Sequence, residues 1–308
     1  MASTSVLVTG SSGFIGRHVV RHLAASGHKV TATDYRPQAD PLPDGIRFHR
    51  CDLCSDPLPC GDFSAIIHLA ALAGVRPSLD RPLDYEQTNV LGTLRLLDHC
   101  RQSGIGRFVL ASSSSVYGPD TPLPAEETAL PCPQSPYALT KLHAEQWGQL
   151  YAKLHGLNFV ALRFFSVWGP GQRHDLALEA FRRKIEARQP IVIHGDGSQR
   201  RDLTHVEDVA RAVESALHWP GHGAAVLNVG TGKNHSVLDM LEAARRSVAA
   251  SRESGSGFTD FTPQVVHQNA HPADVPETRA SLVAVRKALG WQPRIFFPAT
   301  SAPDEGKV

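Results

Sequence analysis

The stretch VLVTGSSGFIG, residues 6–16, decides the fold of this chain. It opens with a short apolar run ending in glycine, which is typical of a buried strand, and residues 14–25 have the apolar spacing of a helix. Gly10, Gly13 and Gly16 therefore form a GxxGxxG turn between a strand and a helix, where glycines permit a tight turn and close approach of a pyrophosphate. We expect this turn to bind a dinucleotide through Gly10, Gly13, Phe14, Ile15 and Gly16.

Carboxylates follow the next two predicted strands. Asp34 ends a strand over residues 29–34, where a carboxylate binds the adenosine ribose hydroxyls and repels a 2′-phosphate. NAD is therefore favoured over NADP, although Arg36 is a nearby cation that works against this exclusion. Asp52 ends a third strand over residues 46–52 and can reach the adenine amino group. The alternative for Asp52 is an ordinary carboxylate in a surface turn.

Strand and helix patterns alternate through the first 165 residues. Further strands are expected at 65–71, 107–113 and 158–165, and helices at 83–103 and 135–155. Such alternation predicts a parallel sheet covered by helices on both faces. The predicted fold class is α/β, a Rossmann-type doubly wound parallel sheet with a smaller mixed α/β C-terminal domain that binds the substrate.

The pattern changes after Gly169. A helical pattern spans 170–201 and includes a short strand, PIVIHG; helices at 208–217 and 237–249 flank a strand at 225–230. Composition predicts a loop at 251–257 and a frayed end at 298–308. We expect residues 1–166 to form the NAD-binding domain, with returning segments near 203–235. Residues 167–202 and 236–308 would form the smaller domain that binds the sugar nucleotide, called the cap below.

Composition limits the possible partners. The 308 residues are 42% hydrophobic and 20% charged, with a formal net charge of +1. No basic field favours nucleic acid, and no apolar run approaches the ~18 residues of a membrane span. The N-terminus lacks the features of a signal peptide, so a cytoplasmic location is expected. Of five cysteines, Cys51 and Cys54 form a CxxC, a pattern that also occurs in redox and zinc sites. Because the sequence has no second CxxC and no Cys/His cluster with zinc-finger spacing, ordinary reduced thiols and no metal site are expected.

Tyr137 and Lys141 form a YxxxK pattern in the predicted helix at 135–155. Residues four apart share one face of a helix, so the two side chains point into the same space. A free tyrosine has a pKa near ~10, which makes it a poor base at neutral pH. A lysine ammonium and a cationic nicotinamide beside it favour the phenolate. The pair therefore predicts a tyrosine that acts as a general base.

A series of motifs runs through the chain in order. They are TGSSGFIG (9–16), DL (52–53), HLAA (68–71), NVLGT (89–93), SSSSVYG (112–118), SPYALTK (135–141), LRFFSVWGPGQR (162–173) and GDGSQRRDLTHVEDV (195–209). With them the chain resembles the extended short-chain dehydrogenase/reductase superfamily, in its nucleotide-sugar epimerase and dehydratase branch, from about residue 6 to 291. The resemblance implies that NAD oxidises the sugar C4 hydroxyl to a ketone and later returns the hydride.

The resemblance also assigns roles to residues. Tyr137 would be the base at the C4 hydroxyl, Lys141 would bind the nicotinamide ribose, and Ser113 would assist the proton transfer. Further cofactor contacts would come from Leu53, Leu69, Ala70, Ala71, Asn89, Ser112 and Phe164. Dimers in this family often join two helices from each subunit, and the helices at 83–103 and 135–155 are the candidates for a homodimer.

Ser114 and Ser115 bear on the reaction. Family dehydratases have Asp and Glu after the catalytic hydroxyl, where they move the protons needed to expel the 6-hydroxyl. Serines are no strong general acid or base, so the chemistry is expected to stop at the ketone and give epimerisation. A 4,6-dehydratase would need its acid and base from elsewhere in the chain.

Several positions concern the sugar nucleotide. Arg201 matches an arginine that contacts the diphosphate in the family, through guanidinium–phosphate bonds. Arg173 and Ser166 lie in a stretch similar to that of UDP-glucuronate 4-epimerases and, with Ser115, would hold a C5 carboxylate. The other expected substrate contacts are Arg76, Ser114, Ile191, Val192, Gln199 and Asp274. His271 stands where the family often has a phosphate-binding arginine, and Arg279 could compensate.

The resulting expectation is an NAD-dependent UDP-sugar 4-epimerase that interconverts UDP-glucuronate and UDP-galacturonate. The alternative substrates are UDP-glucose and UDP-N-acetylglucosamine, with the same fold and mechanism. A different class of protein, a non-catalytic NAD sensor, is disfavoured because Ser113, Tyr137 and Lys141 are all present.

Overall fold

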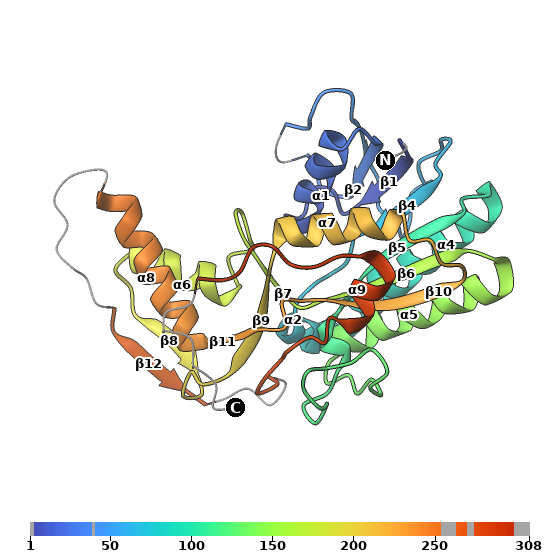
Figure 1. The fold of residues 1–308 in the computed structure, drawn as a ribbon. Coiled ribbons are helices and arrows are strands. Elements are labelled where there is room, and N and C mark those ends of the chain that lie inside the picture. Colours follow the sequence, from blue (N-terminus) through green and yellow to red (C-terminus); the bar gives the residue numbers. More distant parts are fainter. Residues whose placement is uncertain (1–2, 39–40, 254–262, 270–273, 299–308) are drawn as a thin grey trace.

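A seven-stranded parallel sheet forms the larger part of the molecule (Figure 1). The computed structural model describes residues 3–38, 41–253, 263–269 and 274–298. The strand order is β10-β6-β5-β4-β1-β2-β3. The strands are β1 Ser5–Thr9, β2 Lys29–Asp34, β3 Arg47–Arg50, β4 Ala65–His68, β5 Arg107–Ser113, β6 Asn158–Phe164 and β10 Ala224–Val229. This confirms the predicted doubly wound α/β fold.

Helices cover both faces of this sheet. One layer contains α1 Phe14–Ala25, α7 Val206–Leu217 and α9 Val283–Leu289, and the other contains α4 Gly92–Ser103 and α5 Pro136–His155. The packing of strand β1 explains why its three central residues, 6–8, are all apolar. Val6 and Val8 pack into the core cluster with α1 and α7, whereas Leu7 packs with α4. A strand buried on both faces reads as a continuous hydrophobic run.

The chain reverses direction in the sheet beside β1. It builds β1, β2 and β3 toward one edge and then returns to place β4 on the other side of β1. Such a switch point leaves a crevice at the carboxyl ends of the strands, where ligands bind in doubly wound folds. The loops after β1 and β4 therefore lie at the position expected for a cofactor.

The cap lies beside this edge and occupies the left part of Figure 1. It has a three-stranded sheet of β7 Ser166–Trp168, β9 Arg200–His205 and β11 Asn234–Ser236, and a two-stranded sheet of β8 Ile191–His194 and β12 Val265–Gln268. Helices α6 Ala177–Glu186 and α8 Val237–Glu253 pack against each other and against a core that includes Phe181, Ile193 and Met240.

Three predicted elements differ from the observed ones. The helix expected at 83–103 is divided into α3 Pro82–Tyr85, a π-helical turn Glu86–Leu91 and α4, preceded by the short helix α2 Val75–Asp80. The segment 170–201, expected to be largely helical, contains α6, β8 and the first two residues of β9, and it opens with a turn in which Gly169 and Gly171 adopt positive φ angles. Helix α8 reaches Glu253, so the first three residues of the loop expected at 251–257 are helical instead. The remainder of that loop and residues 299–308 lie outside the described part.

Within the described ranges, no helix combines the length and the apolar character needed to cross a membrane.

Candidate active site

A large cleft lies between the carboxyl edge of the seven-stranded sheet and the cap. Its volume is about 1180 Å³, which is enough for a dinucleotide and a sugar nucleotide together. The predicted residues that line it are Gly10, Gly13, Phe14, Ile15, Gly16, Asp34, Asp52, Leu53, Leu69, Ala70, Ala71, Arg76, Ser112, Ser113, Ser114, Ser115, Tyr137, Lys141, Phe164, Ser166, Arg173, Val192, Gln199, Arg201 and Asp274. Among the predicted site residues, Asn89 and Ile191 do not line it.

The glycine turn at the start of α1 has no room for side chains. Gly10 has φ of +71°, and a Cβ there would lie 2.5 Å from the Ala70 nitrogen. A Cβ on Gly16 would lie 2.1 Å from the Gly10 carbonyl oxygen. Gly13, which has no side chain, is the N-cap of α1, and the first turn of the helix contains no acidic residue. A pyrophosphate can therefore approach the backbone of this turn closely, as dinucleotide binding requires.

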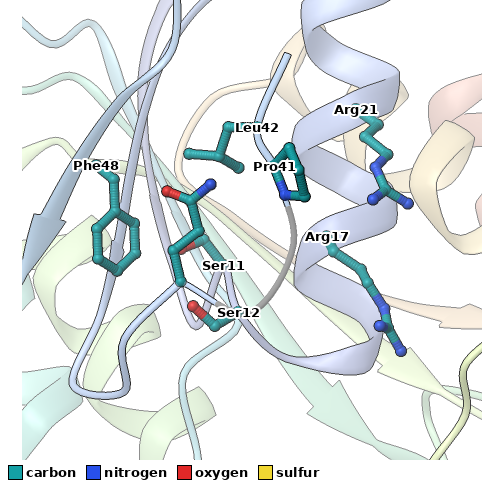
Figure 2. A pocket seen from close by; sticks show the side chains of 8 residues that line it. Ser11, Ser12, Arg17, Arg21, Pro41, Leu42 and Phe48 are labelled. Carbon is teal, nitrogen blue, oxygen red and sulfur yellow. The ribbon is translucent and has the colours of Figure 1, made fainter.

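A second, much smaller cavity borders Ser11 and Ser12 of this turn (Figure 2). Ser11 and Ser12 line it together with Leu42, Phe48 and α1 residues, and its volume is about 20 Å³. The hydroxyls of both serines are buried and have no hydrogen-bond partner among the described residues. A space of this size holds about one water molecule. It is too small for a nucleotide, so the cavity is no alternative to the large cleft.

Asp34 is a nearly buried carboxylate at the end of β2. It accepts hydrogen bonds from the backbone nitrogens of Ser12 and Arg36, both at 3.0 Å. The Arg36 guanidinium also binds it, with Nε 3.2 Å from Oδ1 and Nη2 3.2 Å from Oδ2. The Asp34 carboxylate raises the pKa of Arg36 through this hydrogen bond. Arg36, the cation that works against the exclusion of NADP, is thus paired with the Asp34 carboxylate.

Asp52 and Asn89, both predicted to contact the cofactor, use their side chains to hold neighbouring backbone in place. Asp52 Oδ1 accepts a hydrogen bond from the Cys54 nitrogen at 2.9 Å, as expected for a carboxylate in a surface turn. Asp52 also borders the cleft. Asn89 is buried in the π-helical turn and exchanges two hydrogen bonds with the backbone of Leu72, at 2.8 and 3.0 Å. Asn89 therefore holds the loop after β4 from behind the cleft.

The three predicted catalytic residues come from β5 and α5. Ser113, the last residue of β5, lies close enough to Tyr137 in the first turn of α5 for its hydroxyl to lower the pKa of the phenol. Ser135 caps α5 and accepts a hydrogen bond from the Ala138 nitrogen at 3.2 Å, which fixes this turn beside β5. The structure therefore brings Ser113 and Tyr137 together.

Burial and two polar groups set the ionisation of Tyr137. Burial raises the pKa of the Tyr137 phenol, whereas the Ser113 hydroxyl and the Arg173 guanidinium lower it. Lys141 Nζ is buried and donates a hydrogen bond to the Ala111 carbonyl oxygen at 2.9 Å. Burial lowers the pKa of Lys141 to about 8, and the Glu145 carboxylate opposes this shift. A phenol of raised pKa needs further positive charge before it can act as a base, and a bound nicotinamide cation would supply it.

The serine run continues β5 into a single 3-10 turn, Ser114–Val116. Ser113 Oγ donates to Ser115 Oγ at 3.1 Å and accepts from the Ser115 nitrogen, also at 3.1 Å. Because both Ser114 and Ser115 border the cleft, the run places hydroxyls, and no carboxylate, beside Tyr137.

Arg173 lies in the loop between β7 and α6. Its guanidinium forms a bidentate pair with Asp175, in which Nε lies 2.9 Å from Oδ1 and Nη2 bonds to Oδ2. Nη2 would lie 3.3 Å from a Cβ on Gly74, so the guanidinium rests against the loop after β4. The sequence prediction missed Asp175, although its position two residues after Arg173 was a usable signal.

Arg76 and Asp274 were both predicted to bind substrate, and here they bind each other across the cleft. Arg76 Nη2 lies 2.8 Å from Asp274 Oδ2, and Nη1 lies 3.0 Å from His194 Nε2. Arg76 belongs to α2 of the main domain, whereas His194 ends β8 in the cap. The His271 position, which was compared with a phosphate-binding arginine, lies outside the described residues.

The β8 side of the cleft corrects one prediction. Ile191 was expected to contact the substrate, but it is fully buried in the cap core, whereas Val192 lines the cleft. Alternate residues of a strand face opposite sides, so only one of two neighbours can face the ligand. Gln199 Nε2 donates to the His194 carbonyl oxygen at 2.6 Å, and its buried Oε1 has no partner among the described residues.

Arg201 and Arg279 supply positive charge to the cap wall. Burial lowers the pKa of Arg201, and the nearby Asp274 carboxylate opposes the shift. The Arg201 Nη1 donates to the carbonyl oxygens of Arg200 and Pro276 at 2.9 and 3.3 Å. Arg279 also lines the cleft, and its buried Nε has no hydrogen-bond partner among the described residues.

Residues 6–230 match the model of the NAD dependent epimerase/dehydratase family. The chain belongs to this family. It is 35% identical over 309 residues to UDP-glucuronate 4-epimerase of Thermodesulfobacterium geofontis, covering 94% of this chain and 91% of the relative. It is 33% identical over 330 residues to UDP-glucose 4-epimerase of Azospirillum brasilense, covering 95% and 88%.

Solved structures of the family include MoeE5, determined in complex with UDP-glucose and NAD and in complex with UDP-glucuronic acid and NAD. MoeE5 is 40% identical to this chain, with a TM-score of 0.84 over 95% of this chain and 94% of MoeE5. Family membership confirms the predicted enzyme class, a nucleotide-sugar epimerase that is an isomerase using NAD, and it confirms the predicted cofactor. The alternative of a non-catalytic sensor is thereby set aside.

Proposed function

We propose that this NAD-dependent UDP-sugar 4-epimerase interconverts UDP-glucuronate and UDP-galacturonate. The observation that carries the proposal is the position of Arg173. Its guanidinium lies in the cleft close enough to Tyr137 to lower the pKa of the phenol, and it already binds a carboxylate, that of Asp175. A cation beside the catalytic base is suited to a sugar that carries a carboxylate next to the reacting carbon.

The chain's own groups then have defined tasks. Tyr137 takes the proton of the C4 hydroxyl, and the nearby Ser113 hydroxyl assists that proton transfer. NAD, when bound in the cleft, would supply the acceptor and donor for the hydride of C4. Between these events the 4-keto sugar presents its other face. Ser114 and Ser115 provide no acid or base at C5 and C6, which favours return of the hydride over elimination.

The C6 carboxylate needs restraint because a 4-keto uronic acid is a β-keto acid and loses CO2 readily. We place Arg173, Ser115 and Ser166 around this carboxylate, and all three line the same cleft. Charge-assisted hydrogen bonds that hold the carboxylate near the ring plane would keep the breaking C–C bond out of overlap with the ketone. Suppression of decarboxylation is thus the chemical reason for these three groups.

Assays of the purified protein on UDP-glucuronate, UDP-glucose and UDP-N-acetylglucosamine test the proposal. We expect turnover of UDP-glucuronate, and its absence would overturn the substrate assignment. Arg173→Ala should slow epimerisation of UDP-glucuronate and increase the UDP-pentose by-product. Unchanged epimerisation and by-product in Arg173→Ala would refute the carboxylate role. UDP-glucose is the second candidate, because MoeE5 was also determined with that ligand.

We further propose a homodimer formed by the helices over 82–103 and 136–155. Large apolar side chains remain exposed on these helices, among them Leu83 at 82% and Leu154 at 61% exposure. Helices α3 and α5 pack against each other, so these exposed leucines belong to neighbouring elements. An apolar surface of this kind is typical of a protein–protein interface.

A further inference from the structure

Arg173 is held by a carboxylate from its own loop. The Asp175 carboxylate binds the guanidinium in a bidentate pair, which is the geometry that a uronate carboxylate would also adopt with arginine. The side chains of Arg173 and Asp175 are 38% and 56% exposed. Ion pairs as exposed as this contribute little to stability and can exchange partners readily.

Both residues border the cleft, so the pair is within reach of a ligand. The Arg173 guanidinium hydrogen-bonds the Asp175 carboxylate and lowers its pKa, which keeps Asp175 ionised near neutral pH. An incoming sugar carboxylate must therefore compete with a carboxylate that is already bound. A neutral sugar presents no such competitor and leaves the internal pair intact.

We propose that Asp175 is a specificity-determining residue that acts as an internal stand-in for the C6 carboxylate. It neutralises Arg173 when a neutral sugar or no sugar is bound, and it yields Arg173 to a uronate. The inference rests on the proposed function insofar as it takes Arg173 to meet the C6 group. The displaced Asp175 side chain turns to solvent, for which its exposure leaves room.

This role predicts effects of opposite sign on two ligands. In Asp175→Asn the competitor for a uronate is removed, so UDP-glucuronate should bind about two- to fivefold more tightly, the factor that an exposed ion pair of ordinary strength is worth. UDP-glucose would instead cover an arginine without its anionic partner, so its affinity should fall. A role limited to folding would change both affinities in the same direction.

The measurement is calorimetric titration of NAD-loaded protein in a Tyr137→Phe background, which prevents turnover. UDP-glucuronate and UDP-glucose are each titrated into Tyr137→Phe and into Tyr137→Phe/Asp175→Asn. A lower Kd for UDP-glucuronate together with a higher Kd for UDP-glucose supports the inference, and an unchanged Kd for UDP-glucose overturns it. An unchanged or higher Kd for UDP-glucuronate overturns it, and so does a lower Kd for both ligands.

Two further variants sharpen the test. Asp175→Glu keeps a competing carboxylate and should bind UDP-glucuronate more like the parent than Asp175→Asn does. Glu242→Gln removes a comparable ion pair of the cap, with Arg246 Nε 3.2 Å away and no place in the cleft, and should leave both Kd values unchanged. Turnover of UDP-glucuronate by the unmodified enzyme tests the proposed function alone, so failure of one idea can be told from failure of the other.

Discussion

Glu145 and Arg163 form a buried ion pair behind the catalytic residues. Arg163 Nη2 lies 2.8 Å from Glu145 Oε2, and the side chains are 4% and 1% exposed. Arg163 Nε also binds Oε1 at 3.0 Å, and the Ser112 hydroxyl donates to the same oxygen. Glu145 follows Lys141 by one turn of α5, and Ser112 precedes Ser113 on β5. The pair therefore connects both elements that carry catalytic groups.

Glu145→Ala is expected to destabilise the protein by about 3–5 kcal/mol, because it leaves the Arg163 guanidinium buried and unpaired. The remaining contact of Arg163 is with the Tyr117 ring, whose centroid lies 4.8 Å away, and this cannot replace a carboxylate. Denaturant titration of the free energy of unfolding is the measurement. Glu242→Ala, on the exposed face of α8, serves as the control and should cost less than about 0.5 kcal/mol. A loss below about 1 kcal/mol in Glu145→Ala would contradict the assigned role.

His68 is expected to make the stability of the protein depend on pH in the acid range. Burial lowers the pKa of its imidazole to about 3, and the nearby Lys141 ammonium adds to this. The ring bridges the hydroxyls of Thr9 and Thr93 at 2.7 and 2.9 Å. The unfolded chain takes up a proton near pH 6.5 and the folded chain does not. Stability should therefore fall as the pH drops from about 6.5 toward 3, with a limiting slope of about 1.4 kcal/mol per pH unit from this residue.

His68→Gln removes this titration while keeping a polar group between the two threonines. The free energy of unfolding, measured between pH 6 and 4, should depend less steeply on pH in the variant than in the parent. All other titrating groups are common to both proteins and cancel in the difference. Parallel pH dependences would show that His68 is not the responsible group.

The sequence predicted those parts of the site that depend on local spacing. The glycine turn follows from steric limits at Gly10 and Gly16, and the shared helix face of Tyr137 and Lys141 follows from a spacing of four. Asn89 was assigned to the cofactor by resemblance, although its amide is consumed by the backbone of Leu72. Local spacing carries no information on such tertiary partners.

Contacts between distant segments of the chain could not be predicted from the sequence for the same reason. Arg76 and Asp274 are separated by 198 positions, and their pairing depends on how the cap meets the sheet. The error at Ile191 was avoidable, because Ile191 and Ile193 alternate with Val192 and His194 along one strand. Two isoleucines on one side of a strand indicate its core face.

Arg76 ties the two walls of the cleft, and its removal should weaken sugar-nucleotide binding. Arg76→Ala eliminates a cation that faces the cleft along with its bonds to Asp274 and His194. We expect the KM for the UDP-sugar to rise about five- to tenfold with kcat within about twofold, as for loss of a charge-assisted hydrogen bond. Steady-state kinetics measures both constants. Arg81→Ala, in the exposed pair with Asp84 outside the cleft, should leave them unchanged, and a fall in kcat at constant KM for Arg76→Ala would refute this role.

The proposed homodimer can be tested at Leu83 and Leu154. A glutamate at both positions would place charges in an apolar contact, where an unpaired buried carboxylate is strongly unfavourable. The double variant Leu83→Glu/Leu154→Glu should therefore be monomeric by size-exclusion chromatography with light scattering, whereas the parent should be a dimer. Val283→Glu alters a residue of α9 that is 73% exposed and lies outside these helices, so it should leave the dimer intact. A monomeric parent, or a double variant that remains dimeric, would exclude an interface on this pair of helices.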